Sequence, residues 1–164
     1  MSSRRHRIDS SMGLRSDYLQ NLTEAHVKNF RNVLPCDYFK SAEVKSNESY
    51  ICNLSDSKSK GSHYVAIQIR KDEVIYFDPY GLHCSNKDIL EKISQIGFKQ
   101  ITYCTKCVQS LFSNFCGFFC LAFLLYTENH SVEDFFNLFD MNNLENNDNI
   151  CMNIIKENLK HKMK

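Results

Sequence analysis

A chain of 164 residues with a formal net charge of +1 fits one domain of ordinary size, and this balance requires neither a nucleic acid nor a membrane surface as partner. A hydrophobic fraction of 43% is enough to fill a normal core. The longest apolar run, Phe115–Tyr126, is too short to span a bilayer, so we expect a buried helix there.

The first fifteen residues carry four arginines among serines and lack the apolar segment of a secretory signal. We therefore expect a flexible basic tail over residues 1–15 and a single domain over residues 16–164. A nuclear-targeting or nucleic-acid-binding arm is the alternative for this tail. Eight cysteines without a secretory signal indicate free thiols in a reducing, intracellular compartment.

The first half of the chain changes from a helical to an extended pattern. Apolar residues at near-helical spacing predict one helix, or two short ones, over Ser16–Val33, ended by Pro35. Tyr50–Leu54 is a candidate strand. His63–Arg70 then alternates with period two and Glu73–Asp78 follows as another strand, so we expect these two to form an antiparallel hairpin.

The second half of the chain is mostly helical in pattern. Ser85 and Asp88 resemble a capping box before an amphipathic helix that ends at Gly97, and Gln100–Cys104 is a third strand candidate. Further helices are expected over residues 114–129, 131–139 and 150–160, with an Asn-rich loop at 141–149. A helical start, a small sheet and further helices predict an α+β fold without internal repeats.

Cys116 has the features of a nucleophile. It lies in the first turn of the apolar helix, after Ser113 and Asn114, either of which can cap that helix. The unpaired N–H groups and the positive end of the helix dipole favour a thiolate there, and the thiolate is the attacking species. Cys120, one turn later among phenylalanines, is expected to be an inert core residue. On the helix alone, Cys116 can equally be a core cysteine.

His63 and Asp78 are the candidates for a base and for the group that orients it. His63 starts one strand of the expected hairpin and Asp78 ends the other, so the two lie side by side if the hairpin forms. Histidine is suited to deprotonate a thiol near neutral pH, and a carboxylate can fix its tautomer. Pro79 biases Asp78 to an extended conformation. Taken singly, His63 can be structural and Asp78–Gly81 a tight turn.

Gln109 lies seven residues before Cys116 and carries a side-chain amide donor. With the Cys116 backbone N–H, this amide can form an oxyanion hole. In the expected reaction, His63 takes the Cys116 proton, the thiolate attacks a carbonyl carbon, and the imidazolium protonates the leaving amine before water releases the acyl group. This chemistry requires no metal or other cofactor.

Four segments together resemble the adenovirus-type cysteine endopeptidases (adenain family), which are related to the ubiquitin-like-protein-specific proteases. The segments are Gly61-Ser-His-Tyr64, Tyr76-Phe-Asp-Pro-Tyr-Gly81, Val108-Gln-Ser110 and Asn114-Phe-Cys-Gly-Phe-Phe-Cys120. They match the family in the order of histidine, acid, glutamine and cysteine, in the aromatic residue after the histidine, and in the aromatic-rich helix. The resemblance covers about residues 60 to 126, is looser over residues 34–39, and does not reach the C-terminal third.

The resemblance implies a papain-like cysteine-protease fold of circularly permuted order, with a small, mostly antiparallel sheet packed against helices. It implies an endopeptidase that cleaves viral or virus-like precursor proteins, such as capsid or core precursors, at glycine-containing sites during particle maturation. The expected compartments are the host nucleus or cytoplasm and the virion. The family also implies a peptide or DNA as a possible activator, and Cys104 or Cys107 could pair with a peptide thiol. We expect a monomer without a membrane partner.

Three alternatives stay open. The first is a different substrate. The adenovirus enzyme has glutamate where this chain has Asp78 and tryptophan where this chain has Tyr64. An aspartate as the acid resembles the ubiquitin-like-protein-specific proteases, which implies cleavage of ubiquitin-like conjugates. A non-catalytic binding module on a protease fold is the second. A zinc-binding module is the third, because four ligand-type residues lie close in sequence, although at irregular spacing. These are His83, Cys84, Cys104 and Cys107.

Overall fold

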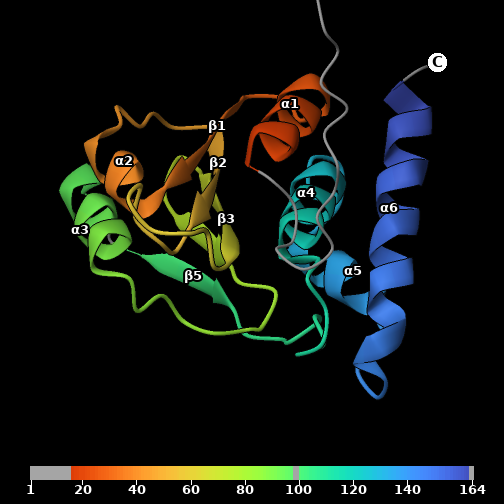
Figure 1. Cartoon of the computed structure of the whole chain (residues 1–164). Coiled ribbons are helices and arrows are strands. Elements are labelled where there is room, and N and C mark those ends of the chain that lie inside the picture. The colour runs from red at the N-terminus through yellow and green to blue at the C-terminus, as the bar shows by residue number, and fades with distance from the viewer. Residues whose placement is uncertain (1–15, 98–99, 163–164) are drawn as a thin grey trace, which may run out of the picture.

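The computed structural model describes residues 16–97 and 100–162, so the expected basic tail over residues 1–15 lies outside the described part (Figure 1). The first helix, α1 (Ser16–His26), is shorter than expected, and β1 (Phe30–Pro35) follows it. The prediction of helix through Val33 is therefore wrong. Asn29 has a φ of 59°, a left-handed conformation that ends the helical path, and the residues after it pair with a neighbouring strand instead.

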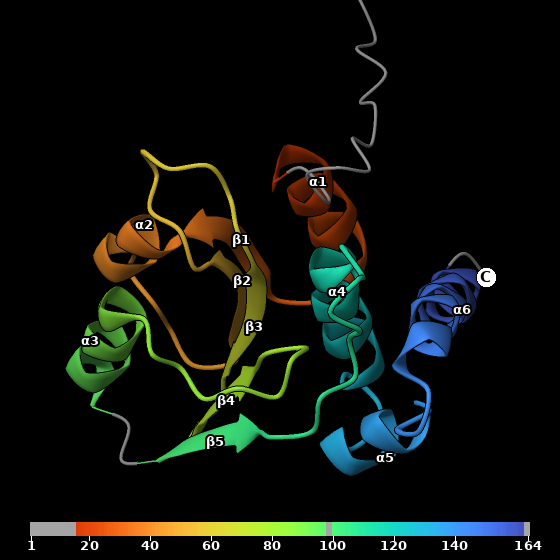
Figure 2. The same cartoon turned by 60° about the horizontal axis from the view of Figure 1, so that its bottom comes forward.

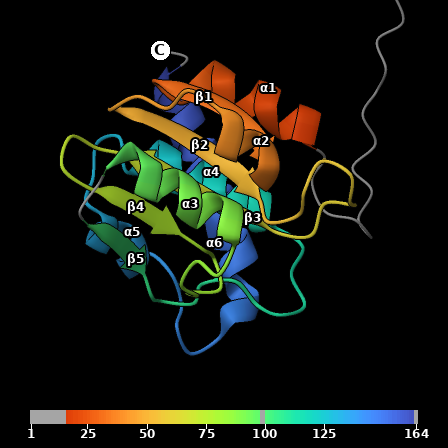
Figure 3. The same cartoon turned by 90° about the vertical axis from the view of Figure 1, so that its left-hand side faces the viewer.

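Five strands form one mixed sheet in the order β1-β2-β3-β4-β5 (Figure 3). After β1 come β2 (Glu48–Asn53), β3 (Tyr64–Ile69), β4 (Val74–Phe77) and β5 (Ile101–Cys104). The β3–β4 hairpin is antiparallel as predicted, and so is the β2–β3 pair, whereas β1–β2 and β4–β5 are parallel. The α+β class is confirmed, but the sheet is mixed rather than mostly antiparallel.

Two helices make the parallel pairings possible. Parallel neighbours need a crossover connection, and α2 (Cys36–Ser41) connects β1 to β2 while α3 (Lys87–Ile96) connects β4 to β5. Helix α3 is capped by the Asn86 side chain, which accepts from the Ile89 N–H, rather than by the expected Ser85. Figure 2 shows both helices on the same side of the sheet, opposite α4.

Apolar side chains fill both faces of the sheet. Successive strand residues point to opposite faces, so Val65 and Ile67 of β3 pack toward α2 and α3, while Ala66 packs toward α4. The predicted alternation of β3 is therefore real, yet its second face is covered as well. The covering layer comprises α1, α4 (Cys116–Tyr126) and α5 (Val132–Asn137). Helix α6 (Asn147–Lys162) packs on α4, on the side away from the sheet (Figure 2).

Helix α4 is the centre of this second layer. All its residues from Cys116 to Leu125 are buried, as expected for a helix that is apolar all round. It begins at Cys116 with Phe115 at the N-cap position, and neither Ser113 nor Asn114 caps it. Helix α6 begins at Asn147, three residues before its expected start, directly after a short 3₁₀ turn (Leu144–Asn146). Within the described residues, no helix combines the length and apolarity needed to cross a bilayer.

Candidate active site

Three candidate catalytic side chains come from three separate elements and meet at one end of the sheet. His63 immediately precedes β3, Asp78 immediately follows β4, and Cys116 is the first residue of α4. His63 Nε2 lies 2.8 Å from Asp78 Oδ1, and Cys116 lies near enough to the same ring to raise its pKa. The hairpin joins the first two residues, and the packing of α4 on β3 supplies the third.

The acid is held in one orientation. Asp78 is buried, and its Oδ1 also accepts a 2.8 Å hydrogen bond from the Tyr80 N–H. The Gly81 N–H donates to the Asp78 carbonyl oxygen at 2.7 Å and closes a tight turn. The Tyr80 ring stacks on the His63 ring, with centroids 4.7 Å apart and an interplanar angle of 17°. The predicted turn and the predicted orienting role are therefore compatible, and Tyr80 is a support that sequence reasoning missed.

The surroundings raise the pKa of His63 from 6.5 to about 9. Burial by itself lowers this pKa, because it disfavours the charged ring, but the hydrogen bond to Asp78 and the influence of the nearby Cys116 outweigh it. Since Nε2 is engaged by Asp78, Nδ1 is the ring nitrogen left for the sulfur. A protonated ring in this position can stabilise a thiolate and can donate a proton to a leaving group.

Gln109 is buried in the loop between β5 and α4. Its Nε2 donates a 3.0 Å hydrogen bond to the Ser113 carbonyl oxygen, which leaves one amide hydrogen for an incoming oxygen. The Val108 and Gln109 N–H groups both donate to the Pro79 carbonyl oxygen, at 2.9 Å and 3.1 Å. Backbone hydrogen bonds to Pro79 thus join Gln109 to the turn that carries Asp78, and its side chain bonds to Ser113 on the way to Cys116. Its side chain makes no hydrogen bond to His63, Asp78 or Cys116 in the described part of the chain.

Gly81 allows the acid-bearing turn to approach this loop closely. Its φ of 73° is left-handed, and a Cβ there would lie 2.8 Å from backbone atoms of Thr105, Lys106 and Cys107. A side chain at position 81 would therefore be strained and would push the two segments apart. The turn after β4 and the loop before α4 form one packed unit.

The start of α6 holds the same loop from the other side. Asn147 is fully buried, and its Nδ2 donates to the Val108 and Asp140 carbonyl oxygens, both at 2.9 Å. Asp148 Oδ1 accepts a 2.7 Å hydrogen bond from the Ser113 hydroxyl, which in turn accepts from the Phe115 N–H at 3.1 Å. Sequence reasoning missed both α6 residues because they lie in an Asn-rich stretch without a recognisable motif.

The remaining cysteines are less suited to nucleophilic chemistry. Cys120 is fully buried, and burial raises its pKa well above the usual range, as expected for an inert core thiol. Burial also raises the pKa of Cys104 to about 12, and the Cys107 thiol donates to the Gln109 carbonyl oxygen at 3.4 Å.

The four candidate zinc ligands, all in the described part of the chain, do not form a metal-binding group. Among them, His83 stacks on Tyr103 with ring centroids 4.1 Å apart. Over residues 16–97 and 100–162, no group of three or more His, Cys, Asp or Glu side chains could hold a metal ion.

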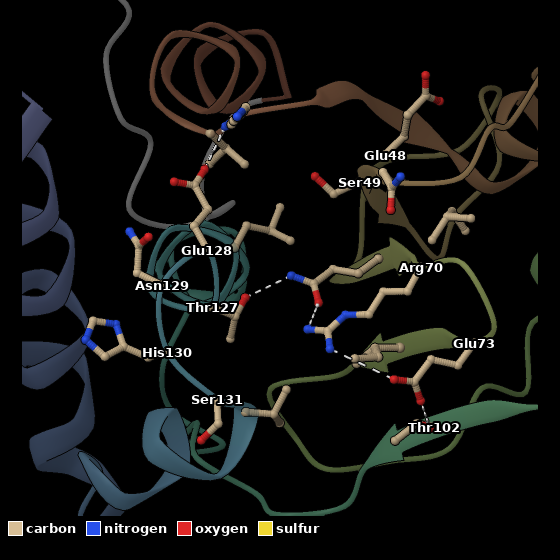
Figure 4. Close-up of a pocket in the computed structure, with 18 of the residues that line it drawn as sticks. Glu48, Ser49, Arg70, Glu73, Thr102, Thr127, Glu128, Asn129, His130 and Ser131 are labelled. Atoms are coloured by element: carbon tan, nitrogen blue, oxygen red, sulfur yellow. Dashed lines mark hydrogen bonds and ion pairs between the residues drawn. The ribbon is translucent and has the colours of Figure 1, made fainter.

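A cavity of about 1020 Å³ lies at the other end of α4, beyond Thr127 (Figure 4). Its walls carry a chain of polar contacts: Gln68 donates to Thr127 at 2.8 Å, and Arg70 donates to Gln68 at 3.1 Å. Arg70 also forms an ion pair with Glu73 at 3.9 Å, and Glu73 accepts a hydrogen bond from Thr102 at 2.7 Å. None of the four predicted catalytic residues lines this cavity, so it is separate from the candidate active site.

Comparison with known proteins supports the fold alone. No protein-family model matches the chain, and no curated protein matches it. Among solved structures, the central domain of the uncharacterized Lpg1148 protein from Legionella pneumophila is similar, with a TM-score of 0.53 and 16% sequence identity. The similarity covers 93% of this chain and 99% of that one, so the α+β arrangement is shared over almost the whole length.

Proposed function

We propose that this chain is a cysteine endopeptidase with Cys116 as nucleophile, His63 as base, Asp78 as the residue that orients the base, and Gln109 as an oxyanion donor. The observation that carries the proposal is one imidazole ring that is hydrogen-bonded to Asp78 Oδ1 at 2.8 Å and whose pKa is raised by both Asp78 and the nearby Cys116. This is the arrangement that an activated thiol needs: a nucleophile, a base in reach, and a third group that orients the base.

In the proposed reaction, the Cys116 proton passes to His63 Nδ1, and the thiolate then forms a bond to the scissile carbonyl carbon. The carbonyl oxygen becomes an oxyanion, which the Gln109 amide and the Cys116 backbone N–H stabilise. Collapse of this intermediate breaks the C–N bond, and the His63 imidazolium gives its proton to the departing amine. Water, deprotonated by His63, then attacks the thioester and releases the acid and the thiol.

For the substrate, we propose viral or virus-like precursor proteins cut at glycine-containing sites, as the resemblance of residues 60–126 to the adenovirus-type enzymes implies. A second candidate is a ubiquitin or ubiquitin-like conjugate. The acid favours this second candidate, since Asp78 occupies the position where the adenovirus enzyme has glutamate and the ubiquitin-like-protein branch has aspartate. Both substrates present a peptide or isopeptide carbonyl to the same thiol, so the chemistry does not distinguish them.

A labelling experiment tests the nucleophile directly. Wild type, Cys116→Ala and Cys120→Ala are treated with a limiting amount of chloroacetamide near neutral pH, and the modified cysteine is located by mass spectrometry. Rapid modification is expected in wild type and in Cys120→Ala and is expected to be lost in Cys116→Ala. Equal rapid labelling of both variants would contradict the assignment of Cys116.

A second experiment separates the two substrate classes. The wild-type protein is incubated with ubiquitin-family activity probes and, in parallel, with precursor proteins encoded in the same genome. Cleavage of the precursors in wild type but not in Cys116→Ala supports the first class, and reaction with the probes supports the second. Failure with both sets, in a protein whose Cys116 is labelled rapidly, would contradict the substrate classes while leaving the thiol chemistry intact.

A further inference from the structure

Two large apolar side chains are exposed to solvent in the loop that leads into the candidate nucleophile. Leu111 is 85% exposed and Phe112 is 93% exposed, more than any other large apolar residue in the described part of the chain. Single exposed apolar residues are common on protein surfaces, but an adjacent pair of this size exposes a substantial apolar area to water. Their position decides what this pair can contact.

The pair lies on a turn that is held in place by hydrogen bonds. The Ser113 N–H donates to the Ser110 carbonyl oxygen at 3.0 Å, and the Phe112 N–H donates to the Ser110 hydroxyl at 3.2 Å. Ser113 is also bound by Gln109 and by Asp148. Leu111 and Phe112 are therefore the exposed tip of an ordered turn, so a partner that covers them does not pay for ordering a flexible loop.

This turn spans the two groups that act on the scissile carbonyl. Gln109 precedes it and Cys116 follows it, so the exposed tip stands at most five residues along the chain from either group. Residues 110–115 include no charged side chain. The chemistry that this tip offers to a passing polypeptide is therefore apolar contact without charge selection.

We propose that Leu111 and Phe112 form an apolar rim that selects protein substrates with a large apolar side chain within three residues of the cleaved bond. The proposal rests on the proposed cysteine-protease function and adds a specificity to it. Because burying one or two large apolar side chains strengthens binding substantially, kcat/KM is expected to be about 10-fold to 100-fold higher for substrates with such a side chain than for substrates with a small polar one.

The test compares wild type with Leu111→Ser/Phe112→Ser. Both proteins are profiled with internally quenched peptides that place Leu, Phe, Ser or Asp at each of three positions on either side of the cleaved bond. Wild type is expected to prefer Leu or Phe at one or more of these positions by about 10-fold to 100-fold, and the double variant is expected to lose that preference. An unchanged profile in the double variant, or no apolar preference in wild type, would overturn the rim.

Two controls separate this result from failure of the protease proposal or of folding. The rate of Cys116 modification by chloroacetamide reports the thiol alone and is expected to be the same in wild type and the double variant. Absence of rapid Cys116 modification in the wild-type protein would contradict the protease function rather than the rim. Leu138→Ser removes an exposed leucine at the end of α5, outside the loop before α4, and is expected to keep the wild-type profile.

Discussion

The Ser113 hydroxyl donates a 2.7 Å hydrogen bond to Asp148 Oδ1 and so joins the loop that precedes the candidate nucleophile to the first turn of α6. The same serine accepts from the Phe115 N–H and, through its carbonyl oxygen, from the Gln109 amide. One residue thus links the start of α4, the candidate oxyanion donor and the C-terminal helix. The position of Gln109 therefore depends on a helix that contributes no group of its own to the chemistry.

Replacing Asp148 with alanine tests this positioning role. The Ser113 hydroxyl then loses its acceptor, and the Gln109 anchor is free to shift. We expect kcat to fall by at least about 10-fold, because a hydrogen bond to a charged group contributes about 1.5 kcal/mol or more, with little change in KM. Asp148→Asn keeps a side-chain oxygen and is expected to restore most of kcat in steady-state kinetics. A loss of stability with unchanged kcat in Asp148→Ala would show a purely structural role.

The pKa of His63 predicts how stability depends on pH. Its folded-state pKa of about 9 lies above the ordinary value of 6.5, so the protonated ring stabilises the fold below about pH 6.5 and this contribution is lost as the pH rises through 9. Since one pKa unit corresponds to about 1.4 kcal/mol, the full effect is roughly 3 kcal/mol. Urea unfolding from pH 6 to pH 9.5 measures it. His63→Gln is expected to show a flatter profile, and parallel profiles would contradict the prediction.

Asp78 and His63 are expected to differ in their effect on turnover. In the proposed mechanism Asp78 orients the ring and transfers no proton itself, so Asp78→Ala is expected to lower kcat less than His63→Ala. Removing the carboxylate should also lower the pKa of His63, because its hydrogen bond to Asp78 is the largest influence that raises this pKa. An NMR titration of the His63 ring in Asp78→Asn measures the shift. An unchanged ring pKa would contradict the assigned contact.

Two glycines with similar backbone angles form a matched pair for testing the loop packing. Gly81 and Gly97 have φ values of 73° and 81°. A Cβ at Gly81 meets backbone atoms at 2.8 Å, whereas a Cβ at Gly97 meets nothing within 4 Å. Gly97→Ala is expected to cost about 1 kcal/mol in unfolding free energy, for the left-handed conformation alone. Gly81→Ala should cost clearly more and should also lower kcat; equal costs would contradict close packing of the two segments.

The β3–β4 hairpin and the proximity of His63 to Asp78 can be predicted from the pattern of apolar residues within each segment. Alternation over His63–Arg70, followed by a second extended run and Pro79, predicts two adjacent strands, and adjacency of the strands is sufficient to place His63 beside Asp78. The uninterrupted apolar character of Phe115–Tyr126 likewise predicts a fully buried helix with a cysteine in its first turn. These features depend on residues close in sequence, so periodicity is enough to find them.

Other features depend on partners that local pattern does not contain. Residues 30–35 have apolar spacing compatible with a helix, and they form β1 because β2 offers a parallel partner. The mixed sheet similarly depends on where α2 and α3 return the chain. Asn147 contacts Val108 across 39 positions, and Asp148 contacts Ser113 across 35.

The α+β class, the hairpin, the buried helix and the four candidate catalytic residues could all be predicted from the amino-acid sequence. Four other features became visible only in the folded chain: the strand identity of β1, the mixed sheet, the stacking of Tyr80 on His63 and the anchoring of the Gln109 loop by α6. The two groups differ in the range of their interactions. Side-chain periodicity and turn chemistry act between neighbours, whereas a buried amide such as Asn147 finds its acceptor only after distant segments have packed together.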